Sequence, residues 1–461
     1  MPNGHKNLLF IHLESISWQT LNAFPESFPN LLRIMSGGRR FRSYYSSATS
    51  TQMVMAFLLH GNDFEFDAAP GLSQPAANNP SLFSTLEARG YRAEFLGVSA
   101  FRVGPMLPPL ARSLPPVWTT DDFAQLIARF EAAIAQSPFA VYVWNLVTHI
   151  EHAMALHTFS DGTDDLLGGA CAVADRILGA LYEMLERRGL LDDTIIVLFG
   201  DHGDDFWTHG FKRGFVHGTE PYTHVVHAPL IVCDPALPPV DDHRLASTVD
   251  IAPTCLDLLG IPKNFPFAES GVSLVSGAER SVCFSQNFTA NQPDAEARDV
   301  RKAFAVNDGS YALLASTRGL ELFNHRLDPT NHCNLLHFCE IVDGELMLDH
   351  PRGPSASHFG TVLQYMVGGE RTIPQRFKRL QNELVRQVTS KNRYVAEHGQ
   401  PPFQILDPSR LQVINRTGQS AFFDVVGDAP IPLPNRDPRQ TRTLLRNITD
   451  AMLGRGRHVG R

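Results

Sequence analysis

The first 262 residues alternate between short apolar runs and longer segments whose apolar positions lie three or four residues apart. The short runs have the length and the β-branched and aromatic content of buried strands: residues 7–13, 93–97, 139–144, 194–199 and 229–233. The longer segments have helical periodicity: residues 122–136, 170–188 and 250–259. This alternation predicts an α/β fold with a doubly wound, mostly parallel sheet and helices on both of its faces.

The pattern changes after about residue 275. Residues 303–314 indicate two strands joined by a turn at Asn307-Asp308-Gly309, and residues 355–398 are typical of helix. We therefore predict a main domain over residues 1–275, a small C-terminal antiparallel β subdomain over 276–345, and a helical and irregular extension over 346–461. The Pro-rich stretch 430–438 indicates a linker or loop.

Composition and charge narrow the class of protein. Of the 461 residues, 43% are hydrophobic and 19% charged, which indicates a globular protein and excludes disorder for most of the chain. A net charge of -8 argues against a general nucleic-acid binder. The basic stretch 436–461 is typical of a solvated tail, with contact to an acidic partner or a membrane face as the alternative.

The sequence also suggests a compartment. The longest apolar run, residues 139–147 with only Asn145 polar, is half the roughly 18 residues that a membrane span needs, so we expect no transmembrane segment. The first residues lack the features of a secretory signal, which predicts a cytoplasmic protein. Six cysteines without a Cys-x-x-Cys pair indicate reduced core thiols.

Two candidate groups follow predicted strands. Glu14 comes directly after the first strand, and Asp201 and His202 follow the strand 194–199 between Gly200 and Gly203. Because ligands gather at the carboxyl edge of such a sheet, these side chains can meet there. A charged residue that ends a strand is usually just exposed, so Glu14 alone means little. An Asp and a His side by side can bind one metal ion.

Four more histidines follow closely: His209, His217, His224 and His227. Core histidines are usually single, so this density favours a functional site over packing. For His224 and His227, a structural role or simple exposure remains the alternative.

Three hydroxyl residues, Thr49, Ser50 and Thr51, precede an apolar helical run. Their ordinary role would be an N-cap. The alternative is a nucleophile at a helix N-terminus, where backbone N–H groups favour an anionic substrate. A threonine hydroxyl would need a metal ion to stabilise its alkoxide, and the carboxylates and imidazole described above could hold that ion.

In their order and surroundings, these pieces resemble the sulfatase and alkaline phosphatase superfamily over about three quarters of the chain. The similar blocks are residues 7–14, 28–31, 51–61, 86–91, 147–149, 189–197, 200–203, 228–232 and 249–261, followed by 320–335. The resemblance implies an alkaline-phosphatase-like fold in which residues 1–275 form the catalytic domain.

The candidate nucleophile indicates which branch of this superfamily the sequence resembles. Thr51 stands ten residues before Gly61, where sulfatases have a Cys or Ser that is converted to formylglycine, and threonine cannot undergo that conversion. Glu14-Ser15 stands where sulfatases carry paired aspartates. Both features resemble the phosphoethanolamine transferases and lipoteichoic acid synthases. Those transferases begin with several membrane helices, which this sequence does not show.

That resemblance implies roles for individual residues. It implies one divalent ion with four ligands: Glu14, Thr51, Asp201 and His202. It also implies that Thr51 becomes transiently phosphorylated and that His149 and His217 contact the phosphate. His217 opens a stretch similar to the His-Gly-Thr-Pro-Tyr of the phosphoethanolamine transferases, while the role of His209 stays open.

The sequence thus predicts a metal-dependent hydrolase or transferase of phosphodiester-type esters with a covalent Thr51 intermediate. Three oxygens and one nitrogen suit zinc first and manganese next. The substrate would be a small molecule or a glycan or lipid head-group ester, with water or a hydroxyl as acceptor. The alternatives are a sulfuric ester hydrolase without formylglycine and a catalytically silent binding protein. Residues 345–461 would shape the substrate entrance or a homo-oligomer contact.

Overall fold

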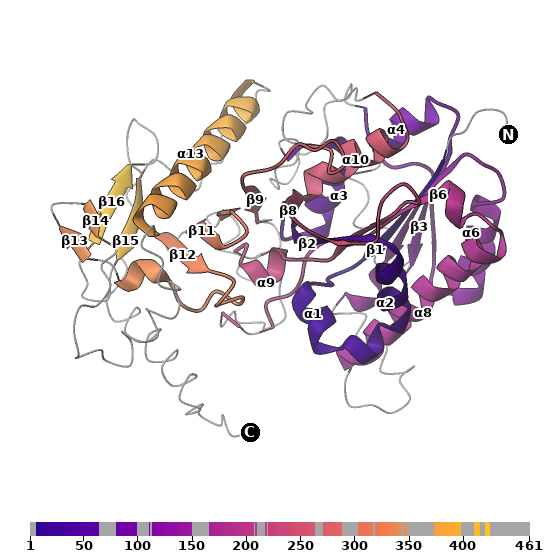
Figure 1. Cartoon of the computed structure of the whole chain (residues 1–461), viewed down its shortest axis with the longest axis horizontal. Coiled ribbons are helices and arrows are strands. Elements are labelled where there is room, and N and C mark those ends of the chain that lie inside the picture. The colour runs from indigo at the N-terminus through magenta and orange to yellow at the C-terminus, as the bar shows by residue number, and fades with distance from the viewer. Residues whose placement is uncertain are drawn as a thin grey trace.

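A computed structural model describes the chain, and its main part is an eight-stranded sheet (Figure 1). The described residues are 6–63, 80–98, 110, 113–149, 166–206, 208–209, 217–218, 220–262, 271–287, 303–316, 319–338, 340–342, 345–347, 373–397, 410–414 and 420–424. The strand order is β4 (Val117–Thr120), β3 (Arg92–Val98), β5 (Phe139–Asn145), β1 (Asn7–Leu13), β6 (Thr194–Gly200), β7 (Leu230–Cys233), β2 (Arg39–Tyr45) and β8 (Asp241–Ser247). Within this sheet β7 runs antiparallel to both of its neighbours and all other pairs are parallel.

Helices cover both faces of this sheet, as predicted for a doubly wound fold (Figure 1). One face carries α1 (Trp18–Ala23), α2 (Pro29–Gly37), α6 (Phe123–Ala133) and α8 (Leu166–Arg187). The other carries α3 (Thr51–His60), α4 (Leu82–Glu87) and α10 (Ile251–Leu258). Because side chains alternate along a strand, Leu9 and Ile11 of β1 belong to the first core, and Leu8 and Phe10 to the second.

A second, antiparallel sheet follows in the order β12 (Gly319–Asn324), β11 (Tyr311–Ser316), β10 (Phe304–Asn307) and β9 (Cys283–Gln286). The predicted hairpin is confirmed: β10 pairs with β11 around a turn in which Gly309 has φ 84°. That backbone conformation suits glycine, which has no Cβ. The domain boundaries at residues 275 and 345 stay predictions.

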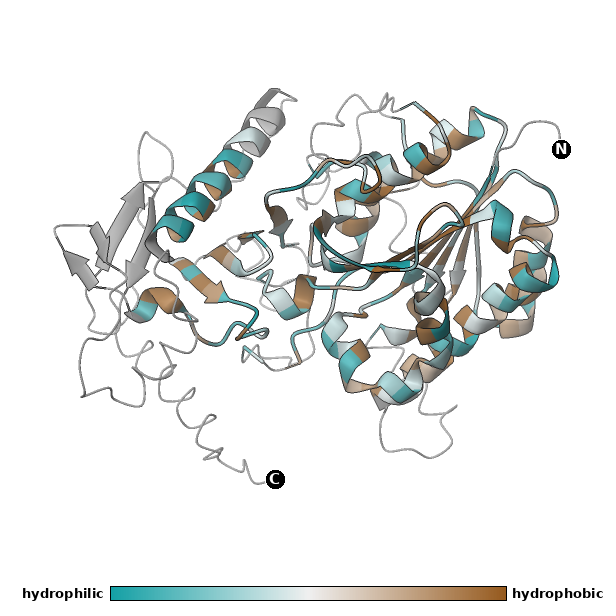
Figure 2. Cartoon of the chain, in the orientation of Figure 1, coloured by the Kyte–Doolittle hydropathy of each residue, from teal (hydrophilic) through white to brown (hydrophobic). Residues whose placement is uncertain are grey.

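One long helix, α13 (Ile373–Glu397), packs on the antiparallel sheet. Its buried side chains lie three or four residues apart: Phe377, Leu380, Leu384 and Val388. Figure 2 shows the hydrophilic residues that cover much of the rest of this helix. Arg376 and Arg379 bind the buried Asp308 of the β10–β11 turn, so the helix is also tied to the sheet by charge.

Two hairpins in the C-terminal part were not predicted. They are β13 (Glu340–Val342) with β14 (Glu345–Met347), and β15 (Arg410–Ile414) with β16 (Ser420–Asp424). The predicted helix 355–398 is observed as α13, while its first part, residues 355–372, and the Pro-rich stretch 430–438 lie outside the described residues. Among the helices that are described, none is both long and apolar enough to cross a membrane.

Gly200, the last residue of β6, permits a close contact between backbone segments. A Cβ on Gly200 would lie 2.0 Å from the carbonyl oxygen of Ile16 and 3.0 Å from Cδ of Pro229. We expect Gly200→Ala to lower the free energy of unfolding by about 2–3 kcal/mol, because backbone must shift to make room. Urea denaturation measures this change. Gly37→Ala is the matched control, since a Cβ there meets no atom of the described residues within 4 Å. Equal midpoints for both variants would contradict the prediction.

Two buried histidines predict how stability depends on pH. Burial lowers the pKa of His60 to about 4 and that of His325 to about 3. As pH falls, the unfolded chain takes up these protons first, near pH 6.5, and the free energy of unfolding decreases from there towards pH 4. The loss at pH 5 is about 2 kcal/mol for each histidine. Urea denaturation of His325→Gln at pH 7 and pH 5 should show a smaller difference than wild type, and an unchanged difference would refute this.

Candidate active site

The ends of neighbouring strands bring the first site residues together. Leu13 of β1 pairs with Asn145 of β5 and with Gly200 of β6, so the residues that follow β1 and β6 leave the sheet side by side. These are Glu14 and Asp201. The backbone N–H of Ser15 donates to Oδ1 of Asp201 at 2.9 Å, and Ser15 has the unusual φ of 54°. The turn after β1 is therefore held in a strained conformation by the carboxylate that follows β6.

A different set of hydrogen bonds positions Thr51. The segment before it pairs with β9: Thr49 donates its N–H to the carbonyl oxygen of Gln286, and Gln286 donates to that of Ser47, both at 3.1 Å. Ser50 then occupies the N-cap position of α3 with an extended backbone but without a side-chain capping hydrogen bond, and Thr51 is the first residue of the helix. The hydroxyl of Thr51 thus lies at a helix N-terminus, beside backbone N–H groups without partners inside the helix.

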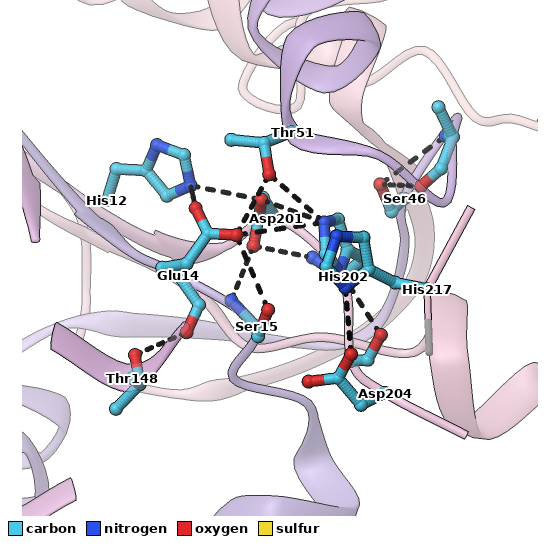
Figure 3. A network of polar contacts seen from close by, with 12 residues as sticks. His12, Glu14, Ser15, Ser46, Thr51, Thr148, Asp201, His202, Asp204 and His217 are labelled. Carbon is cyan, nitrogen blue, oxygen red and sulfur yellow. Dashed lines mark hydrogen bonds and ion pairs between the residues drawn. The ribbon is translucent and has the colours of Figure 1, made fainter. Parts of the chain in front are cut away.

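The structure brings Glu14, Thr51, Asp201 and His202 into one buried cluster (Figure 3). Oγ1 of Thr51 lies 2.9 Å from Oε1 of Glu14 and 3.2 Å from Nε2 of His202. Nε2 of His202 lies 3.3 Å from Oδ2 of Asp201 and 4.0 Å from Oε1 of Glu14. These atoms therefore come from three segments of the chain, the ends of β1 and β6 and the start of α3, and lie around one point.

Two aromatic residues of the cluster were missed in the sequence. His12 lies on the same face of β1 as Glu14, and its Nε2 is 3.3 Å from Oδ2 of Asp201 and 3.8 Å from Oε2 of Glu14. Its Nδ1 pairs with the hydroxyl of Tyr142 at 2.9 Å. Trp144 donates its indole N–H to Oε2 of Glu14 at 2.8 Å. The alternation of a strand could have indicated His12, which stands two residues before Glu14.

Burial sets the charge state of the two carboxylates. It raises the pKa of Glu14 to about 8, with the neighbouring Asp201 carboxylate as the second cause. Burial alone would also raise the pKa of Asp201, but the imidazoles of His202 and His12 outweigh it and hold that pKa below its usual range. Within the described part of the chain, Oδ2 of Asp201 and Nε2 of His12 are buried and make no hydrogen bond, although they lie 3.3 Å from each other. Two close carboxylates and such unpaired atoms are the surroundings that suit a cation.

His217 and His149 lie beside this cluster. The ring of His217 is 4.5 Å from that of His202 and 5.3 Å from that of His149. Nδ1 of His217 lies 2.8 Å from Oδ1 of Asp204. Burial alone would lower the pKa of His217, but this hydrogen bond raises it to about 9. His217 therefore carries a positive charge at neutral pH next to the buried carboxylates.

The remaining histidines of the dense region lie elsewhere. His209 and His224 both contact Asp205 and form a second cluster. His227 pairs its Nε2 with the carbonyl oxygen of Arg42 at 2.9 Å. The five histidines from position 202 to position 227 are thus divided between two clusters and a structural contact.

Comparison with known proteins agrees with this architecture. The family model described as Sulfatase matches residues 6–103 and 116–261. The chain belongs to the sulfatase family. Rat arylsulfatase K is 25% identical over 259 residues, which are 50% of this chain and 45% of that protein. Human arylsulfatase A is 23% identical over 476 residues, covering 87% of this chain and 92% of that protein. The chain thus spans about half the length of rat arylsulfatase K and most of arylsulfatase A.

Solved structures share the fold. A phosphonate monoester hydrolase of Agrobacterium radiobacter has a TM-score of 0.55 at 16% identity, with 75% of this chain and all of that chain covered (100%). The lipoteichoic acid synthase LtaP from Listeria monocytogenes has a TM-score of 0.52 at 15% identity and covers 70% of this chain and 85% of its own. The alkaline-phosphatase-like fold is therefore confirmed, and the superfamily is one of metal-dependent sulfatases and phosphoesterases.

Proposed function

We propose that this protein is a metal-dependent hydrolase or transferase of phosphodiester-type esters that acts through a covalent Thr51 intermediate. The observation that carries the proposal is the position of Oγ1 of Thr51, 2.9 Å from a glutamate oxygen and 3.2 Å from an imidazole nitrogen. A hydroxyl at a helix N-terminus with such neighbours is a nucleophile that needs only a cation to be activated.

The cluster fits one divalent ion. In a tetrahedral zinc site with bonds of about 2.0 Å, neighbouring ligand atoms lie about 3.3 Å apart. Thr51 to Glu14, Thr51 to His202, His202 to Asp201 and His202 to Glu14 are separated by 2.9, 3.2, 3.3 and 4.0 Å. His12, Glu14 and Asp201 also offer ligand atoms within 4.8 Å of one another. Three oxygens and one nitrogen from the first set favour zinc, with manganese next.

When bound, the ion lowers the pKa of the threonine hydroxyl and withdraws charge from the phosphoryl oxygens. The hydroxyl proton of Thr51 goes to solvent, and its oxygen then forms a bond to phosphorus while the bond from phosphorus to the leaving alkoxide breaks. His217 protonates the leaving oxygen from Nε2, because its Nδ1 faces Asp204. In the second step water or another hydroxyl gives its proton to His217 and bonds to phosphorus, the bond to Thr51 breaks, and the Thr51 oxygen takes back a proton from solvent. His149, beside His217, contacts the phosphoryl oxygens.

Sulfate-ester hydrolysis is the second candidate. The names of the similar proteins favour it: arylsulfatase K, arylsulfatase A and a choline-sulfatase of Rhizobium meliloti, the last 28% identical over 187 residues. Thr51 cannot become formylglycine, so a sulfate ester would have to be cleaved through a threonine sulfate. The same side chains would serve, with sulfur in place of phosphorus.

A substrate panel with detection of the intermediate tests both functions. The metal-loaded protein is incubated with phosphate monoesters, phosphodiesters, phosphonate monoesters and sulfate esters, and rates are compared. Mass spectrometry of the Thr51 peptide after rapid quenching should show a phosphoryl adduct that retains the head group. A threonine sulfate would favour the second candidate. Neither turnover nor an adduct, in protein that has bound its metal, would favour a silent binding protein.

A further inference from the structure

A second cluster of possible metal ligands, separate from the Thr51 cluster, is built on the segment that follows β6. Asp204 and Asp205 are adjacent, but Asp204 faces His217, whereas Asp205 faces His209 and His224. Oδ1 of Asp205 lies 2.6 Å from Nδ1 of His209 and 3.0 Å from Nε2 of His224. The three side chains are 0, 8 and 1% exposed. One carboxylate oxygen is thus contacted by two buried imidazole nitrogens.

The second nitrogen of His209 shows what this arrangement requires. Nε2 of His209 lies 3.3 Å from the backbone carbonyl oxygen of Asn331, while Nδ1 faces the Asp205 carboxylate. Both facing oxygens are acceptors, so a neutral ring can satisfy only one of them by donating a proton. A charged ring would satisfy both at the cost of its desolvation. A cation beside Nδ1 satisfies both contacts with a neutral ring, because Nε2–H then donates to Asn331. Histidines that bind metals commonly place their other N–H on a backbone carbonyl in this way.

The surroundings hold the cluster in place. Tyr222 stacks on His209 with ring centroids 3.6 Å apart and an interplanar angle of 5°. Asn331, at the left-handed φ of 57°, also accepts the backbone N–H of Thr223 at the start of α9 (Thr223–Val226). The histidine rings are therefore positioned by two separate parts of the chain.

Nδ1 of His224 is buried and has no hydrogen-bond partner among the residues that the structure describes. His224 lines a cavity of about 710 Å³ between α1, β2 and the turn after β12. Polar side chains share this cavity, among them Arg42, Thr223 and His325. Water in this cavity can pair with Nδ1 of His224.

We propose that Asp205, His209 and His224 form a second metal site, which takes zinc or a similar divalent first-row ion. Their ligand atoms lie within 4.8 Å of one another, and one carboxylate oxygen with two imidazole nitrogens and a water is a common zinc environment. The ion links the segment after β6 to α9, and through Asn331 to the C-terminal part. It stabilises this junction and takes no part in the steps at Thr51.

Metal counting in single and double variants tests the second site. Full-length protein is loaded with zinc, desalted and measured by mass spectrometry of the metal. We expect two equivalents in wild type, one in His224→Gln, one in Glu14→Gln and none in the double variant. Glutamine keeps a donor for Asp205 but is a poor zinc ligand. His243→Gln, at an exposed histidine of the same cavity, should keep both equivalents.

Cobalt spectroscopy gives an independent readout of the same site. In Glu14→Gln loaded with cobalt, visible d–d bands report only the second site, and they should disappear when Asp205→Asn is added. Unchanged zinc in both His224→Gln and Asp205→Asn would overturn the second site while leaving the Thr51 site intact. Unchanged zinc in Glu14→Gln alone would instead contradict the proposed function.

Discussion

Replacing Thr51 with alanine should lower turnover at least about a thousandfold, because the proposed covalent intermediate has no other oxygen on which to form. Glu14, Asp201 and His202 remain, so the variant should retain its metal and its fold. Rates on the best substrate of the panel, metal content and thermal unfolding measure the three quantities. Thr51→Ser keeps a hydroxyl at the same position and should preserve part of the activity.

Thr49→Ala provides the matched control, two positions earlier on the same segment. The backbone of Thr49 makes the hydrogen bonds that hold this segment to Gln286 and Gly218, and alanine leaves them in place. We expect near-normal rates for Thr49→Ala and no head-group adduct on Thr51→Ala. An active Thr51→Ala together with an inactive Thr49→Ala would show that the nucleophile is the other hydroxyl.

The sequence predicted those strands whose burial is indicated by a short run of mostly apolar residues. β1, β5 and β6 lie in the centre of the sheet, are buried along their whole length and consist mostly of apolar residues. β2 and β8 were missed because they carry charges, and these charges are satisfied between the two strands. Arg39 pairs with Asp242 at 2.9 Å and Arg40 with Asp241 at 2.7 Å. Such partners lie about 200 residues apart, so no local pattern reveals that the charges belong to a strand pair.

The candidate site divides in a similar way. Glu14, Asp201 and His202 could be placed at one edge because each follows a predicted strand, and parallel strands end together. His12 could have been found from strand alternation. That Asp204 and Asp205 face different clusters could not have been predicted. It depends on how the segment after β6 turns, and adjacent aspartates look equivalent in a sequence. The resulting assignment of His217 to one cluster and His224 to the other required coordinates.

Replacing Glu14 with glutamine should have the second-largest effect on activity. Glutamine has nearly the same shape but removes a negative ligand, so the ion at Thr51 is lost or bound much more weakly. A bound metal supplies several kcal/mol to such a reaction, which corresponds to a rate loss on the order of a thousandfold. Glu94→Gln is the control, because Glu94 is also a buried glutamate but lies on β3 and pairs with Arg129 of α6. It should leave rate and metal unchanged, and excess zinc should partly restore Glu14→Gln.

The same variant should reverse the order of stabilities when metal is removed. With zinc present, wild type should unfold at the higher temperature, since an ion that binds only the folded chain stabilises it. In chelator, burial and the neighbouring Asp201 raise the pKa of Glu14 to about 8, so Glu14 must take up a proton when the chain folds at neutral pH, and Glu14→Gln avoids this cost. The variant should then be the more stable protein. Thermal unfolding of both proteins with zinc and with chelator measures this crossover. If wild type remained the more stable protein in chelator, Glu14 would not be destabilised in the metal-free site. The proposal that Glu14 and Asp201 are placed together to bind an ion beside Thr51 would then be contradicted.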